Sequence, residues 1–218
     1  MIKQSVVNNH IIAHCVISKN VAYKNAEKIF ENKEASVPDF LMAVYRNLEI
    51  PYPKFYKMDS LSKLGWLAAE ILLKDNLDAH KYKASDIGVV LSNASSSLDT
   101  DIKYYETAKD IASPALFVYT LPNIVIGEIC IRHQFKGENA FFVCEKFDGQ
   151  FIEQYVNNLI NNNILQTCIC GWVELLNDQY KAVLFLIEKE KSPGSIFFTN
   201  ENIQKIYQLE NGYTNLGS

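Results

Sequence analysis

The hydrophobic positions of this chain gather into short apolar runs and longer one-sided stripes, a pattern that predicts alternating strands and helices. A continuous apolar run of strand length is typical of a strand buried on both faces of a sheet. Runs of this kind predict core strands at His10–Ile17, Asp86–Asn93, Ala140–Cys144, Thr167–Val173 and Ala182–Glu188. A weaker strand is predicted at Ile196–Thr199, after a turn at Lys189–Ser195.

The clearest predicted helix begins at Ser60, where apolar side chains recur every three or four residues and Ser60 is available as the N-cap. Its stripe consists of Leu61, Leu64, Leu67, Ala68, Ile71 and Leu72. Further helices are predicted near Asp39–Leu48, Asp99–Ile111, Leu121–His133, Gly149–Ile164 and Glu201–Glu210. Pro122 fits the first turn of its helix, which needs no amide there. The remainder of residues 22–58 is predicted to be irregular.

Strands that alternate with helices of ten or more residues favour a parallel or mixed sheet that is covered on both sides. The sequence contains no internal repeat and no long linker, so we expect a single domain over residues 1–218. Its core covers about residues 10–190. Residues 195–218 form a carboxy-terminal extension that is expected to cover a sheet edge or part of the helix at Gly149–Ile164.

Composition excludes several classes of protein. The chain has 218 residues, of which 48% are hydrophobic, and its formal charge of -4 gives no electrostatic reason to expect binding to nucleic acid. No apolar run reaches the roughly 20 residues that cross a bilayer, so we expect a cytoplasmic protein. The five cysteines form no disulfide framework and no zinc motif, and no cofactor is expected. Cys168 and Cys170 are predicted to be core residues on opposite faces of one strand.

Several short motifs, taken in order, resemble the amino-terminal half of a β-ketoacyl synthase, a condensing enzyme of the thiolase fold. The motifs are Phe55-Tyr56-Lys57-Met58-Asp59, Asp86-Ile87-Gly88-Val89-Val90-Leu91, Ser113-Pro114-Ala115-Leu116-Phe117, Leu121-Pro122-Asn123, Phe135-Lys136-Gly137-Glu138-Asn139 and Cys170-Gly171-Trp172-Val173-Glu174. The resemblance covers residues 55–188. It implies one three-layer α/β/α half of a thiolase fold, with a five-stranded, mixed, mostly parallel core sheet.

The resemblance fails at the position of the nucleophile. When Gly149 is aligned with the glycine that ends the family's Cys-x-Ser-Gly turn, Lys146 replaces the reactive cysteine. The family also uses two histidines from a second half, which this sequence is not expected to contain. Decarboxylative condensation needs the thiolate and both imidazoles. The resemblance therefore implies a degenerate site with no catalytic residue.

Two side chains keep a catalytic alternative open. Cys144 lies two residues before Lys146, whose charge would favour a thiolate. Because side chains alternate along a strand, Cys144 is instead expected to be buried and inert. Lys146 itself would be a nucleophile if it were desolvated, but a solvated lysine, or one paired with Glu145 or Asp148, is the expected state.

The helix predicted at Gly149–Ile164 has one apolar face and one rich in Gln and Asn. In a full condensing enzyme the corresponding helix lies between two sheets and is apolar all round. The pattern here predicts a self-contained half whose outer surface is solvated.

Thiolase-fold enzymes pair through the strand that leads into the nucleophile, so the resemblance implies an interface at Ala140, Phe141, Phe142, Val143 and Cys144. It also implies a function. The chain is similar to the non-catalytic chain-length-factor subunits that pair with a full-length β-ketoacyl-ACP synthase in fatty-acid and polyketide-type biosynthesis, such as aryl polyene or flexirubin-like pigment clusters. One alternative is an acyl-thioester transferase or hydrolase that uses Cys144 or Lys146. The other is a homodimer that binds acyl carrier protein as a scaffold.

Overall fold

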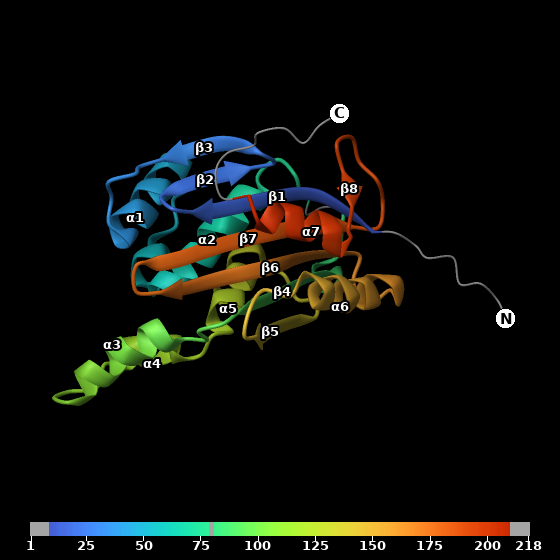
Figure 1. The fold of residues 1–218 in the computed structure, drawn as a ribbon. Helices are drawn as coiled ribbons and strands as arrows, with labels where there is room; N and C mark the ends of the chain where they lie inside the picture. Colours follow the sequence, from blue (N-terminus) through green and yellow to red (C-terminus); the bar gives the residue numbers. More distant parts are fainter. Residues whose placement is uncertain (1–8, 79–80, 210–218) are drawn as a thin grey trace.

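A computed structural model describes residues 9–78 and 81–209, which are organised around one mixed sheet (Figure 1). The strand order is β3-β2-β1-β7-β6-β4-β5, and β8 pairs with β1. The strands are β1 (His10–Ser18), β2 (Val21–Lys24), β3 (Glu27–Glu31), β4 (Ile87–Asn93), β5 (Asn139–Val143), β6 (Thr167–Leu176), β7 (Gln179–Glu188) and β8 (Ile196–Phe197).

The predicted core sheet is confirmed, and four of its five strands run in the same direction. β4 is parallel to both β5 and β6, whereas β7 is antiparallel to its neighbours β6 and β1. β1 therefore has the direction of β6. The strand β4, which lies between β6 and β5, is buried at every position, as expected for a strand that is covered on both faces.

The sheet has eight strands, and not the predicted five, because an antiparallel hairpin extends it beyond β1. The prediction that this segment is irregular is wrong for β2 and β3. These strands have only four and five residues, and β3 is charged and mostly exposed, so they lack the longer apolar run that marked the core strands. Residues Lys19 and Asn20 make the tight turn before β2 with positive φ values of 49° and 59°.

Helices cover both faces of the sheet and form the predicted three layers (Figure 1). The helices are α1 (Val37–Leu48), α2 (Ser60–Leu73), α3 (Leu98–Ala108), α4 (Pro114–Phe117), α5 (Ile124–His133), α6 (Gly149–Asn161) and α7 (Asn200–Tyr207), with 3₁₀ turns η1 (Pro53–Lys57), η2 (Ala84–Asp86) and η3 (Val118–Thr120). One face packs against α1, α2 and α5, and the other against α6 and α7.

The helix α2 is the central element of the first face, in contact with β1, β6 and β7 and with both α1 and α5. The N-cap of α2 is Asp59, which accepts a hydrogen bond from the Ser62 amide at 2.9 Å, so the predicted cap at Ser60 is one residue late. Helix α5 also begins later than predicted. Its N-cap is Asn123, which leaves Pro122 in the turn before the helix.

The helix α6 has the predicted one-sided character. Ile152, Val156 and Ile160 are buried against the sheet, while Gln154 and Asn158 are exposed. The described part of the carboxy-terminal extension contains β8 and α7. β8 pairs with the part of β1 that β2 does not reach, and α7 packs beside α6. Residues 210–218 of that extension lie outside the described residues.

Cys168 and Cys170 share one face of β6, where both join the core under α6 and α7. The prediction of opposite faces is wrong, because side chains two residues apart in a strand point to the same side. Burial raises the pKa of both thiols, as expected for structural cysteines.

The backbone conformation and close packing at Gly171 explain why the Cys170–Glu174 motif has a glycine at this position. Its φ is 147°, and an added Cβ would lie 2.0 Å from the Val183 carbonyl oxygen on the neighbouring strand. We predict that Gly171→Ala destabilises the fold by at least about 3 kcal/mol. The matched control is Gly127→Ala in α5, where an added Cβ meets no atom within 4 Å. That variant should gain about 0.5–1 kcal/mol from helix propensity. Urea denaturation measures both, and equal effects would contradict this account.

Burial lowers the pKa of His14 to about 4, so this side chain is neutral in the folded protein at pH 7. In the unfolded chain His14 binds a proton near pH 6.5. Its contribution to the free energy of unfolding is therefore fully present above that pH and is lost as the pH falls toward 4. Between pH 7.5 and pH 5 the loss should be about 2 kcal/mol. Urea midpoints of His14→Gln should vary less over this window, whereas an unchanged pH dependence would remove His14 as the cause.

Candidate functional site

The predicted interface strand β5 lies at an edge of the sheet, and β4 is its only partner strand in the described chain. Two hydrogen bonds show which of its backbone groups are used: the Glu138 carbonyl accepts from Val89, and the Cys144 amide donates to Asn93. Because backbone groups alternate sides along a strand, the amides and carbonyls of Asn139, Phe141 and Val143 face away from β4. This row of groups is a template for another strand.

The side chains of β5 offer apolar area at the same edge. Phe141 and Phe142 are half-buried, one on each face of the sheet, and Val143 is 56% exposed. Phe142 packs edge-on against Phe151 and Tyr155 of α6, with ring centroids 4.8 and 5.0 Å apart. These contacts fix the ring and leave part of it open at the edge.

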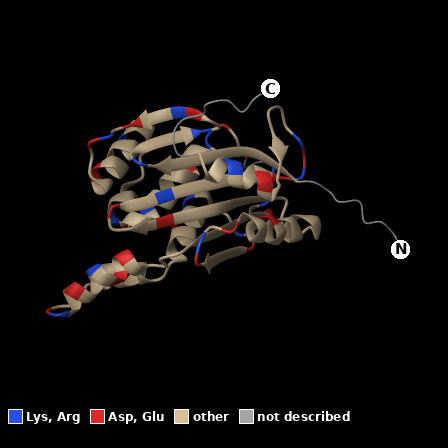
Figure 2. Cartoon of the chain, viewed as in Figure 1, with Lys and Arg blue, Asp and Glu red and all other residues tan. Residues whose placement is uncertain are grey.

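The opposite edge of the sheet has a different character. The edge strand β3 carries Glu27, Lys28 and Glu31, and Lys28 pairs with Glu31 at 2.8 Å. Figure 2 shows these charges along β3, whereas the β5 arrow carries none. Charged side chains protect a strand edge from pairing. The edge at β3 is therefore protected and the edge at β5 is not.

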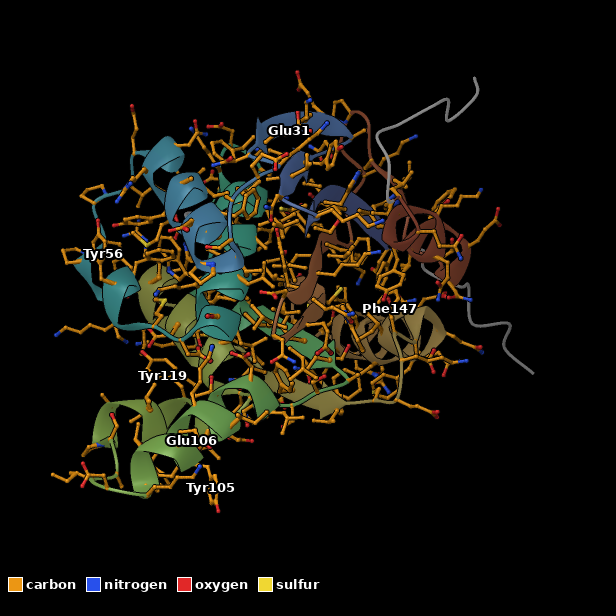
Figure 3. All side chains as sticks on the ribbon, turned by 60° about the vertical axis from the view of Figure 1, so that its left-hand side comes forward. Glu31, Tyr56, Tyr105, Glu106, Tyr119 and Phe147 are labelled. Atoms are coloured by element: carbon orange, nitrogen blue, oxygen red, sulfur yellow. The ribbon has the colours of Figure 1, made fainter. Side chains whose placement is uncertain are left out.

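The turn after β5 holds the predicted nucleophile position, and Lys146 is exposed there. No hydrogen bond or ion pair joins Lys146 to another side chain in the described chain. The next residue, Phe147, points inward and stacks on Tyr207 of α7 at 4.1 Å and edge-on against Trp172 at 5.8 Å (Figure 3). Asp148 then caps α6 by accepting a hydrogen bond from the Phe151 amide at 2.9 Å. An aromatic side chain therefore fills the space under the turn.

Cys144 lies directly after the end of β5 and is half-buried, which is more exposed than predicted. Partial burial and then the negative charge of Asp148 raise the pKa of its thiol, so the neutral thiol is favoured. A nucleophilic cysteine needs the opposite environment. The geometry gives neither Cys144 nor Lys146 the surroundings of a catalytic residue.

A helical excursion, residues 94–123, projects from the body beyond the end of β4 and was not identified as functional from the sequence (Figure 1). It carries half of the large, exposed hydrophobic side chains of the described chain: Leu98, Ile102, Tyr105, Ile111, Phe117, Val118 and Leu121. Their exposure ranges from 44% at Leu98 to 80% at Ile111. In both Figure 1 and Figure 3 the excursion lies on the same lower side of the molecule as β5. The spacing of the apolar positions in α3 was the available sequence signal, but periodicity does not distinguish a buried face from an exposed one.

The base of the excursion is held by buried polar contacts. Tyr119 donates a hydrogen bond to the buried Glu128 carboxylate at 3.1 Å, and Lys54 pairs with the same carboxylate at 2.7 Å. Thr100 donates to Asp59 at 2.7 Å. Figure 3 shows Tyr119 toward the body and Tyr105 on the outer side. The excursion is thus anchored at its base while its outer face stays free.

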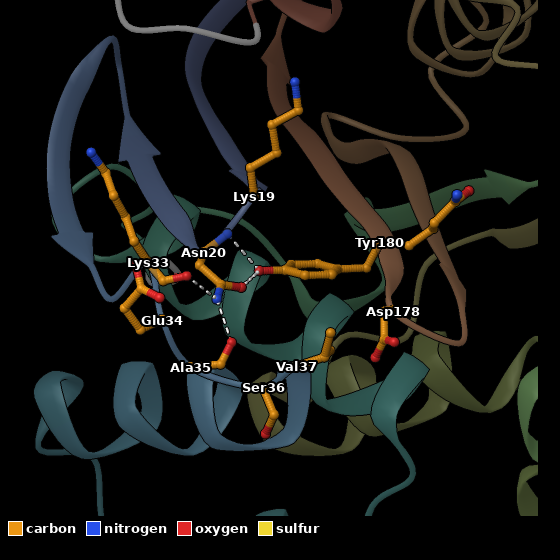
Figure 4. Close-up of a pocket in the computed structure, with 10 residues that line it drawn as sticks. Lys19, Asn20, Lys33, Glu34, Ala35, Ser36, Val37, Asp178 and Tyr180 are labelled. Atoms are coloured by element: carbon orange, nitrogen blue, oxygen red, sulfur yellow. Dashed lines mark hydrogen bonds between the residues drawn. The ribbon is translucent and has the colours of Figure 1, made fainter.

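A cavity of about 910 Å³ lies far from β5, between the β1–β2 turn, the β6–β7 turn and the start of α1 (Figure 4). Asn20 organises one wall: its backbone amide donates to the Tyr180 hydroxyl at 2.8 Å, and its side chain donates to the Ala35 carbonyl at 2.6 Å. Each of these polar groups has a hydrogen-bond partner among the others. The packing of the three loops therefore accounts for this wall of the cavity.

Two further kinds of site receive no support. Within residues 9–78 and 81–209, no three His, Cys, Asp or Glu side chains gather as metal ligands. No single described helix is long and apolar enough to cross a bilayer, although the bent pair Pro114–Thr120 and Ile124–His133, at 98°, has the length and composition.

Comparison with solved structures identifies the fold. The ishigamide ketosynthase/chain length factor matches with a TM-score of 0.59 and 17% identity, over 86% of this chain and 63% of that chain. The chain has the ketosynthase fold. A type II PKS ketosynthase, in a complex with its acyl-carrier protein, matches with a TM-score of 0.58 and 16% identity, over 83% of this chain and 62% of that chain. This chain therefore spans less than two thirds of both structures.

A third structure with this ketosynthase fold is a ketosynthase in complex with its chain length factor from Xenorhabdus doucetiae. Its TM-score is 0.57 and its identity 12%, over 85% of this chain and 80% of that chain. No protein-family model matches the sequence, and no curated protein matches it. The likeness establishes the fold that the short motifs predicted.

The environment of Cys144 can be tested with a matched variant. Asp148→Asn keeps a good helix N-cap but removes the charge that disfavours the thiolate. Alkylation of Cys144 at pH 8, followed by peptide mass spectrometry, should be slow in the natural protein and roughly two- to fivefold faster in the variant. The rates should converge at a pH at which both thiols are ionised. A slower reaction in the variant would show that Asp148 does not act through charge.

Proposed function

We propose that this protein is a non-catalytic subunit of the chain-length-factor type, which pairs with a full-length β-ketoacyl-ACP synthase through the edge of β5. The observation that carries the proposal is the unprotected edge of β5, where three residues present unused backbone groups beside apolar side chains. Strand addition would satisfy those groups and bury Phe141, Phe142 and Val143. In this proposal residues 1–218 act as one domain.

The apolar face of the excursion supports the same partner. An apolar surface of this kind is typical of a protein interface, and it lies on the side of the molecule that holds β5. In this proposal the partner that extends the sheet at β5 also contacts the outer face of α3. Two of the solved structures with this fold contain, by their descriptions, a ketosynthase and a chain length factor.

The turn at Lys146 supports a role without catalysis. Lys146 is exposed, Phe147 fills the space below it, and Cys144 has a raised pKa. The partner would supply the thiol and both imidazoles of the condensation reaction. We place this pair in fatty-acid or polyketide-type biosynthesis in the cytoplasm, of the aryl polyene or a related pigment kind, with acyl carrier protein as a further partner.

Co-expression with the full-length synthase of the same organism tests the pairing. We expect a one-to-one complex that survives size-exclusion chromatography. Val143→Lys places a charge at the proposed interface and should abolish the complex, because the ammonium would be desolvated there. Ile29→Lys is the matched control, since Ile29 is an exposed residue of the opposite edge strand β3. It should leave the complex intact.

The same experiment separates the alternatives. The heterodimer would be rejected if the protein formed only a homodimer. It would also be rejected if the protein never co-purified with the synthase and the synthase elongated normally alone. A covalent acyl adduct on Cys144 or Lys146 after incubation with acyl thioesters would favour the transferase or hydrolase. If both lysine variants weakened the complex equally, the interface would not lie at β5.

A further inference from the structure

A second cavity, of about 330 Å³, lies on the face of the sheet opposite α6, at the ends of α1, α2 and α5. Its walls are mainly apolar and include Leu73 and Phe135. Its polar groups are Glu70 and Lys74 from α2 and Arg132 and His133 from the last turn of α5. A concave apolar site with a few converging polar groups is the usual form of a small-molecule site.

The polar groups are arranged around a buried carboxylate. Glu70 is only 7% exposed, and one of its oxygens lies 3.0 Å from Arg132 Nε and 3.0 Å from His133 Nε2. Burial by itself raises the pKa of Glu70, but the hydrogen bonds and charges of His133 and Arg132 outweigh burial and lower it overall. His133 also stacks on Phe135, with ring centroids 5.2 Å apart. Glu70 and Phe135 therefore hold the end of α5 in place.

Arg132 is only partly used by these contacts. It donates to Glu70 through Nε, and its guanidinium carbon lies 5.1 Å from the centre of the Tyr52 ring. No hydrogen bond joins its two terminal nitrogens to another group in the described chain. Arginine has five N–H donors in a planar fork that matches carboxylate and phosphate oxygens. The cavity thus contains a positioned guanidinium with unused donors.

The charges around the cavity favour an anion. Arg132 and Lys74 are positive, and Glu70 is the one acidic residue in the lining. Lys74 is exposed and lies at the rim. An anion that bound the free side of Arg132 would meet a second positive charge at Lys74, while its apolar part would contact Leu73 and Phe135.

We propose that this cavity binds a small amphiphilic anion, whose oxyanion head pairs with Arg132 and whose short apolar tail lies against Phe135 and Leu73. The volume is at the low end of the roughly 300–1,000 Å³ that is usual for ligand sites, so the tail is short. The site is separate from the turn at Lys146, because Phe147 of that turn belongs to the core under α6, whereas α2 covers the opposite face of the sheet. It does not depend on the proposed pairing with a synthase.

Titration of the full chain with hexanoate, hexyl phosphate and hexanol, followed by NMR of backbone amides, tests the proposal. At least one of the two anions should bind saturably and shift the amides of Arg132 and Phe135, and hexanol should bind at least tenfold more weakly. The carboxylate and phosphate arms decide which head group is preferred. Equal affinity for hexanol, or no saturable shift with either anion at millimolar concentration, would overturn the proposal.

Two variants separate binding from folding. Arg132→Lys keeps a charge beside Glu70 but removes the fork, and it should weaken anion binding at least tenfold. The matched control is Arg46→Lys, which changes the other arginine of the chain at an exposed position on α1. Leu77→Trp fills the cavity without changing its charge and should abolish binding while the circular dichroism spectrum is retained. Unchanged affinity in both Arg132→Lys and Leu77→Trp would place the ligand elsewhere.

Discussion

The backbone amides and carbonyls of a β-strand need hydrogen-bond partners on both sides, and the outermost strands of this sheet have a partner strand on one side only. A sheet of eight strands satisfies its interior backbone groups through pairing, and each outer edge must be charged, covered or bound by another chain. β3 carries charges, and β8 covers the part of β1 beyond the reach of β2. β5 has neither form of protection in the described chain. The proposed function follows from this difference between the two edges, since the likeness to ketosynthases establishes the fold alone.

The face of the sheet under α6 and α7 determines the surroundings of the turn at Lys146. Phe147, Trp172 and Tyr207 form one aromatic cluster that joins the turn after β5, the strand β6 and the helix α7. This packing turns Phe147 inward, so the neighbouring Lys146 faces solvent. A site for an acyl thioester would need open space where these rings lie. Aromatic rings fill the space beside the turn, which agrees with the proposed role of a non-catalytic subunit.

Two buried carboxylates on the other face organise the surfaces to which we assign binding. Glu128 joins the base of the excursion to the body through Tyr119 and Lys54, and it thereby fixes the direction in which the apolar face points. Glu70 positions Arg132 and His133 beside the second cavity. A buried carboxylate is costly unless it is paired, so each holds its partners in a defined geometry. Polar groups in this core therefore position surfaces as well as stabilise the fold.

The sequence alone determined the order of strands and helices, because a run or stripe of apolar residues has the period of its own secondary structure. The core strands, the stripe of α2 and the one-sided α6 were all predictable in this way, and short motifs indicated the fold. The β2–β3 hairpin was not predictable, since its strands are short and are stabilised by pairing of β2 with β1 and of β3 with β2. The contact between Glu70 and Arg132 joins residues 62 positions apart, and no local pattern encodes it. The exposure of the apolar face of α3 and the unpaired edge of β5 were likewise decided by tertiary structure, because periodicity specifies which side of an element is apolar but not what lies against it.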